Sequence, residues 1–314
     1  MSFETYREQW RGRVSEVTVG AAGGVNDARK SITVGGAGAL PFIDIDGPIP
    51  HRPAVAAEVW DVRPDWPAPL AMAYGAVLDD PVAWAQKCVR DGADLICLRL
   101  AGADPEAGDA SPEACAAVVR SVLGAVDVPL IILGCGSDEK DNLIFPAVCA
   151  AAEGARCLVG PVHKDNYRTI AAAAKVAGHA VIAQSPVDVN IQKQLAVLLE
   201  EMELGPQDVV FDPTTGALGY GLDYTYSVME RIRLAALQGD RHLSSPLVVF
   251  AGYEAWRAKE AGLAGGSVDQ GVVWEVVTAT ALLHAGADIV VLLHPNAVRA
   301  VKRYLRELTG EAAA

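Results

Sequence analysis

Residues 179–216 read HAVIAQSPVDVNIQKQLAVLLEEMELGPQDVVFDPTTG, two β-branched or apolar runs separated by a helical pattern. The runs cover 179–185 and 209–216. Between them Asp188 stands where a helix N-cap is expected, and an apolar stripe follows at Ile191, Leu195, Leu198, Leu199 and Met202. Continuous apolar runs are typical of parallel strands that are covered on both faces. The stretch therefore predicts a strand–helix–strand unit of a parallel sheet.

The same pattern recurs along the chain and favours a closed barrel. Eight apolar runs appear in order, at residues 55–61, 94–100, 129–136, 155–161, 179–185, 209–216, 246–254 and 288–295. Each gap has room for a loop and a helix, and Pro295 is expected to begin the last helix. The repeats predict an α/β fold, a single (β/α)8 TIM barrel. A doubly wound open sheet is the alternative, but no G-x-G-x-x-G sequence follows the first run.

The first fifty residues precede the barrel pattern. Brief strands are predicted at 14–20, 31–35 and 42–46, separated by Gly-rich turns. We expect an N-terminal extension over residues 1–50, with a β-hairpin that covers the N-terminal face of the barrel. The TIM barrel itself is expected over residues 51–314, because no linker marks a second domain.

Composition narrows the classes of partner. The chain has 314 residues, of which 51% are hydrophobic, enough for one sizeable core. Its net charge of -13 would repel nucleic acid and anionic membranes, so we expect neither as a partner. No stretch reaches about 18 uninterrupted apolar residues, and the first residues are polar. These features lead us to expect a cytoplasmic protein.

Metal and nucleophile patterns are absent from the sequence. None of the six cysteines forms a C-x-x-C pair, so the spacing for zinc or an iron–sulfur cluster is missing. The six histidines include no i, i+4 pair, and no lysine lies inside a predicted strand for Schiff-base chemistry. A carboxylate pair such as Asp212 with Glu254 could still act as acid and base. We expect no metal site and no catalytic residue of this chain's own.

Two loops at the C-terminal ends of predicted strands could bind a ligand, since barrels of this class place their sites there. In the 212–221 loop, three glycines would let the backbone approach a flat ligand, although a purely structural turn is an equal alternative. At 134–137, backbone N–H groups could form an anion-binding nest. A plain helix cap by Ser137 or Asp138 is favoured there, because acidic residues follow.

Six motifs in one order carry a resemblance to a known family. They lie at 53–67, 94–100, 134–141 (GCGSDEKD), 185–190 (SPVDVN), 212–230 (DPTTGALGYG, then YTYSVME at 224–230) and 286–295. With them the chain, over residues 14–308, resembles the small subunit of the corrinoid iron–sulfur protein. The same family is called the delta subunit of the acetyl-CoA decarbonylase/synthase complex.

The resemblance implies a function in acetyl-CoA synthesis. Members of the family form a heterodimer with a large subunit, which carries a 4Fe–4S cluster and a cobalamin-binding domain. The shared cobalamin receives a methyl group from methyltetrahydrofolate through a methyltransferase. It passes the methyl group to acetyl-CoA synthase/CO dehydrogenase in the Wood–Ljungdahl (reductive acetyl-CoA) pathway of carbon fixation.

Barrel geometry then suggests where the corrinoid would lie. We expect the top of the barrel and the partner's cobalamin domain to enclose it, with most contacts from the loops after the fifth to seventh strands. The candidate cofactor-binding residues are Gln184, Ser185, Asp188, Asn190, Asp212, Thr214, Thr215, Gly216, Gly219, Tyr220, Gly221 and Tyr253. In the alternative, the barrel is itself a methyltetrahydropterin:corrinoid methyltransferase, with Asp188, Asn190 and Asp212 as remnants of a pterin site. A metal- or lysine-dependent lyase is the third hypothesis.

Overall fold

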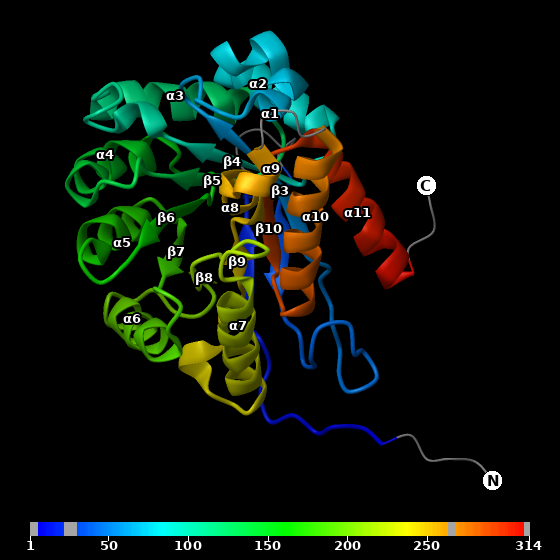
Figure 1. Ribbon diagram of the computed structural model, residues 1–314. Coiled ribbons are helices and arrows are strands. Elements are labelled where there is room, and N and C mark those ends of the chain that lie inside the picture. Colours follow the sequence, from blue (N-terminus) through cyan, green and yellow to red (C-terminus); the bar gives the residue numbers. More distant parts are fainter. Residues whose placement is uncertain (1–5, 22–29, 263–267, 311–314) are drawn as a thin grey trace.

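The computed structural model describes residues 6–21, 30–262 and 268–310, and within them eight parallel strands form a barrel (Figure 1). Neighbouring strands follow in the order β8-β7-β6-β5-β4-β3-β10-β9, and a parallel bridge from Phe211 to Leu247 joins β8 to β9. The strands are β3 (Ala54–Trp60), β4 (Leu95–Arg99), β5 (Leu130–Leu133), β6 (Leu158–Val162), β7 (Ala180–Gln184), β8 (Val209–Asp212), β9 (Val248–Val249) and β10 (Ile289–Leu292). This order confirms the predicted TIM barrel and rules out the doubly wound sheet.

Helices surround the strands, as Figure 1 shows. They are α1 (Ala68–Tyr74), α2 (Pro81–Arg90), α3 (Pro112–Ala125), α4 (Asp138–Ala151), α5 (Tyr167–Val176), α6 (Val189–Glu201), α7 (Leu222–Leu237), α8 (Ala251–Arg257), α9 (Lys259–Gly262), α10 (Val268–His284) and α11 (Pro295–Thr309). The Asp188 carboxylate accepts hydrogen bonds from Asn190 N (2.7 Å) and Ile191 N (3.1 Å), which confirms the predicted N-cap. Pro295 begins α11 as predicted. Ile191 of the expected stripe is exposed, whereas Leu195 and Leu199 are buried.

Side chains alternate between the inside and the outside of the barrel. On β4, Leu95 and Cys97 belong to an inner cluster, whereas Ile96 and Leu98 pack under the helices. The inner cluster also contains Val17, Val19 and Val34 of the hairpin β1 (Glu16–Val19) and β2 (Ile32–Gly35), whose strands pair antiparallel. The hairpin therefore covers the N-terminal end of the barrel, as predicted.

Two sequence predictions about strands were wrong. Residues 42–46 form turns instead of a third short strand, because Phe42 has φ 60° and the N–H groups of Ile43 and Asp46 bond three residues back. The seventh barrel strand is only Val248–Val249, and Tyr253 and Glu254, expected at its end, lie in the first turns of α8. The early helix start is possible because Gly252 lets α8 approach β10: a Cβ there would lie 2.5 Å from Leu293 N.

Candidate functional site

Four of the candidate residues meet where β7 and β8 end. Asp212 accepts hydrogen bonds from Gln184 Nε2 (2.7 Å) and Thr214 N (2.9 Å), and Thr214 Oγ1 donates to the Ser185 carbonyl (2.7 Å). Asp212 is 1% exposed. Burial raises the pKa of this carboxyl to about 6, against the hydrogen bonds from Gln184 and Thr214, and the Glu254 charge raises it further. The structure thus brings four of the candidate residues into one compact polar cluster.

An ion pair between the neighbouring strands β3 and β4 was not predicted from the sequence. Arg99 Nε donates to Glu58 Oε1 (2.6 Å), which also accepts from Trp60 Nε1 (2.8 Å). The guanidinium lies over the Tyr253 ring, 4.9 Å from its centroid, and 5.6 Å from that of Trp60. Burial alone would lower the pKa of Arg99, but the Glu58 carboxylate outweighs it and raises that pKa. One signal was available, since Glu58 interrupts the apolar run AVAAEVW.

Two polar atoms in these groups have no partner within the described residues. Glu58 Oε2 and Ser185 Oγ are buried and accept or donate no hydrogen bond there. A buried polar atom without a partner costs on the order of 1–3 kcal/mol. Both residues lie near the C-terminal ends of their strands, at the end of the barrel that we call the barrel mouth. The mouth therefore has polar atoms that could still bind a polar ligand or water.

The 212–221 loop combines structural and exposed positions. Thr215 Oγ1 accepts from Phe250 N (2.8 Å), and Gly216 N donates to Thr225 Oγ1 (2.8 Å), so both tie the loop to its neighbours. Gly219 and Gly221 have φ of 76° and 91°. Tyr220 is 46% exposed, and its hydroxyl donates to Glu260 (2.9 Å). The loop is thus part scaffold and part accessible surface.

The glycines of this loop should differ sharply in what they tolerate. In Gly216→Ala the Cβ would lie 2.5 Å from the carbonyl of Gly221, a backbone group, so we expect a loss of roughly 2–3 kcal/mol of unfolding free energy. In Gly219→Ala the nearest atom is 3.9 Å away, and only the positive φ costs about 1 kcal/mol. Urea unfolding of both variants measures the difference. Equal losses would contradict this assignment.

Asp188 and Asn190 are not joined to the cluster at Asp212. The Asp188 carboxylate is taken by its own helix, and Asn190 is exposed on α6. Tyr253 reaches the mouth from α8, where its ring supports Arg99.

The chain is similar to known proteins over nearly its whole length. The family model of the CO dehydrogenase/acetyl-CoA synthase delta subunit matches residues 16–311. The acetyl-CoA decarbonylase/synthase complex subunit delta of Archaeoglobus fulgidus is 38% identical, over 98% of this chain and 71% of the relative. That of Methanothermobacter thermautotrophicus is also 38% identical, over 96% of this chain and 77% of the relative.

This chain belongs to the CO dehydrogenase/acetyl-CoA synthase delta subunit family. Its relatives are named as delta subunits of acetyl-CoA decarbonylase/synthase complexes. Similar solved structures include dihydropteroate synthase of Xanthomonas albilineans in complex with 7,8-dihydropteroate (TM-score 0.58, 15% identity, 83% of this chain, 95% of that one). The enzyme of Yersinia pestis with a pterine-sulfa conjugate is similar too (TM-score 0.58, 16% identity, 82% and 95%). At these identities the likeness shows the barrel fold alone.

The possible anion-binding nest at residues 134–137 is occupied by a side chain of the protein itself. Asp141 accepts hydrogen bonds from Cys135 N (2.8 Å) and Gly136 N (3.1 Å), so its own carboxylate occupies the place of an anion. Ser137 is the N-cap by position, but its side chain makes no cap hydrogen bond. Burial raises the pKa of the Cys135 thiol to about 12, so this cysteine is a poor nucleophile.

A buried carboxylate closes the barrel beside the mouth. Glu275 of α10 accepts hydrogen bonds from Trp256 Nε1 (2.7 Å) and from the N–H groups of Leu293 and His294 at the end of β10. Burial raises the pKa of Glu275 to about 7, although these donors oppose it. His294 is 2% exposed and stacks on Trp256 at 5.9 Å, so the one histidine directly after β10 is not open to a ligand above the mouth.

The described part of the delta-family chain holds no arrangement of three or more His, Cys, Asp or Glu side chains suited to a metal ion. All six cysteines lie in that part, where none of them forms a disulfide, and five of them are buried. No helix in the same residues combines the length and apolarity needed to span a bilayer.

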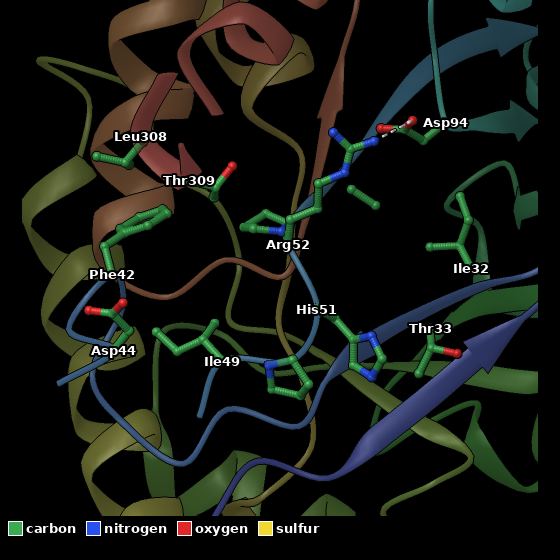
Figure 2. Close-up of a pocket in the computed structure, with 13 residues that line it drawn as sticks. Ile32, Thr33, Phe42, Asp44, Ile49, His51, Arg52, Asp94, Leu308 and Thr309 are labelled. Atoms are coloured by element: carbon green, nitrogen blue, oxygen red, sulfur yellow. Dashed lines mark ion pairs between the residues drawn. The ribbon is translucent and has the colours of Figure 1, made fainter. Parts of the chain in front are cut away.

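A hollow of about 580 Å³ lies at the opposite, N-terminal end of the barrel (Figure 2). Phe42, Ile49 and Leu308 give it an apolar side. Asp94 and Arg52, 4.0 Å apart, lie at another edge, where Lys302 also pairs with Asp94 at 2.6 Å. No candidate residue from the sequence lies in its lining. Thr33, His51 and Asp94 are bound to Thr18, Glu16 and Lys302, so the hollow is a gap between the extension and the barrel.

Proposed function

We propose that this chain is the small subunit of a heterodimeric corrinoid iron–sulfur protein. Its barrel mouth helps to enclose the cobalamin that carries a methyl group from methyltetrahydrofolate, by way of a methyltransferase, to acetyl-CoA synthase. The 4Fe–4S cluster belongs to the large subunit in this proposal, and the route is the Wood–Ljungdahl pathway. Membership in the delta subunit family supports it, since that family supplies a subunit of the acetyl-CoA decarbonylase/synthase complex.

The unpartnered atoms at the barrel mouth carry the proposal. Glu58 Oε2 and Ser185 Oγ are buried with no partner in the described residues, as expected where another molecule completes the site. The 212–221 loop adds two accessible features. The backbone of Gly219 is open, since a Cβ added there would lie no closer than 3.9 Å to any neighbouring atom, and the Tyr220 ring is exposed. A corrin has a broad apolar plane and a rim of amides, so these residues fit its chemistry.

The chain's own residues would bind and shelter the cofactor. Gly219 and Tyr220 would contact the corrin rim, with the Tyr220 hydroxyl held in place by Glu260. Trp60, Arg99 and Tyr253 would exclude water from the centre of the mouth, where the Glu58 pair fixes the guanidinium. When bound, the cobalt supplies the centre that accepts and gives up the methyl group.

Metal analysis tests the proposal. The complex co-purified with its native partners should contain both cobalt and iron, and this chain alone should contain neither. Stoichiometric iron in the isolated chain would contradict the assignment of the cluster to the large subunit.

Within the complex, Gly219→Trp should lower cobalt retention more than Gly219→Asn, because asparagine tolerates a positive φ and is small. Equal retention would show that the loop does not face the corrinoid.

A second candidate function is favoured by one feature of the mouth. Asp212 is a buried carboxyl with a pKa of about 6 and accepts from Gln184, and its backbone carbonyl accepts from the N–H of Ser185, whose hydroxyl has no partner in the described residues. Such groups could bind the N–H edge of a pterin, as a methyltetrahydropterin:corrinoid methyltransferase requires. Titrating methyltetrahydrofolate into the isolated chain distinguishes the two functions. Tight binding that Asp212→Asn abolishes, with methyl transfer to free cobalamin, would favour the methyltransferase.

A further inference from the structure

A hollow of about 420 Å³ lies on the outer surface where the 212–221 loop enters α7. Its half-buried lining residues are Leu218, Leu222 and Tyr226, and its exposed ones include Asp223, Ser227 and Glu230. We call this hollow the α7 groove. Positions 222, 223, 226, 227 and 230 recur at helical spacing, so the groove follows one face of α7. Its apolar floor is open to solvent beside the barrel mouth.

More apolar surface lies around the mouth end of the α7 groove. Tyr224 is 69% exposed and Tyr220 is 46% exposed. The loop is held firmly against α10, since Trp274 Nε1 donates to the Leu218 carbonyl (3.0 Å) and Leu218 N donates to Thr278 Oγ1 (3.2 Å). The groove is therefore a rigid, preformed surface, which lowers the entropy cost of binding.

The charges of the groove define its partner. Asp223 and Glu230 are exposed, and neither makes an ion pair among the described residues. The whole chain carries a net charge of -13, which disfavours a second copy of itself at this acidic face. A segment with apolar side chains and flanking lysines or arginines would satisfy both the floor and the two carboxylates.

We propose that the α7 groove binds an apolar, lysine- or arginine-flanked segment of another subunit of the acetyl-CoA decarbonylase/synthase complex. Membership in that complex requires such an interface, and the α7 groove adjoins the open end of the barrel. The inference rests on complex membership and not on the corrinoid assignment. A complex that assembles through the groove but lacks cobalt would contradict only the corrinoid assignment.

A second apolar hollow, between α4 and α5, serves as a matched control. A hollow of about 430 Å³ between α4 and α5 is also apolar, with Ala150, Ala173 and Val176 in its lining, and it carries one exposed acid, Glu153. Exposed Thr169 takes the place that Ser227 has in the α7 groove. Thr169→Trp there adds the same large side chain, and Glu153→Lys makes half of the charge change of the double variant, without touching the proposed interface.

The test measures binding of the full chain to the remaining subunits of the complex, purified without it, by biolayer interferometry. Ser227→Trp, which fills the groove, and the double variant Asp223→Lys/Glu230→Lys should each bind at least about tenfold more weakly than wild type. Thr169→Trp and Glu153→Lys should bind within about twofold of wild type. Added salt should weaken the wild-type complex more than that of the lysine variant. Circular dichroism and thermal unfolding verify that every variant is folded.

Wild-type affinity in both groove variants would overturn the proposal, as would an equal loss in the Thr169→Trp control. Sedimentation of the chain alone tests whether a second copy of the chain binds in the groove. A dimer that Ser227→Trp disrupts would assign the groove to a second copy and so overturn the proposal as well.

Discussion

Glu275→Ala should lower the free energy of unfolding by roughly 3–5 kcal/mol. The carboxylate is fully buried and accepts from the indole N–H of Trp256 and from two backbone N–H groups after β10. Alanine would leave all three donors unpaired in a dry interior, and each costs about 1–3 kcal/mol before relaxation. It would also loosen the contact between α10 and the last strand. Urea denaturation measures the change.

Glu275→Gln serves as the control and exposes a pH dependence. Because burial holds the pKa of Glu275 near 7, above its ordinary 4.5, the folded state binds an extra proton between these values. Its contribution to stability is therefore present at about pH 4.5 and is lost as the pH rises through 7. We expect wild type to lose roughly 3 kcal/mol relative to Glu275→Gln over that range. The low pKa of His294, about 4, affects both proteins alike. A stability difference independent of pH would disprove the protonation of Glu275.

Glu58→Ala should cost nearly as much, roughly 3–5 kcal/mol, because it leaves the Arg99 guanidinium without its counter-charge. Glu58 is fully buried, and Arg99 retains 19% of its side-chain exposure. The double variant Glu58→Ala/Arg99→Met should recover much of the loss, since no unpaired charge remains and methionine can still pack between Trp60 and Tyr253. Chemical denaturation of the four proteins gives the coupling energy. Purely additive losses would contradict a coupled pair.

Much of the fold could be predicted because barrel strands are coded locally. Within the two runs, residues 180–183 (AVIA) and 209–211 (VVF) are continuously apolar, as is typical of a strand covered on both faces. Asp188 could be recognised as a cap for the same reason, since its two acceptor contacts reach only two and three residues ahead. The prediction failed at residues 246–254, because the end of β9 is set by the packing of Gly252 against Leu293, far away in the sequence.

The polar residues at the barrel mouth also include some that the sequence indicated and some that it did not. Asp212 and Thr214 were recognisable because they end a strand in the same loop, and Gln184 because it ends the strand before. Arg99, Glu58 and Tyr253 come from three separate elements, so their contact depends on long-range packing. Glu275 lies within a helix and gave no pattern that separates it from a solvated carboxylate.

The sequence by itself determined the strand and helix periods, hence the barrel, the hairpin at its N-terminal end and the absence of clustered metal-ligand spacings. Periodic apolar burial is a local property, and strand order follows once each unit is short and right-handed. Only the tertiary structure decided which polar groups are dry and paired. Desolvation depends on all neighbours at once, and so the Glu58–Arg99 pair, the raised pKa of Glu275 and the open α7 groove emerged only when the barrel was complete.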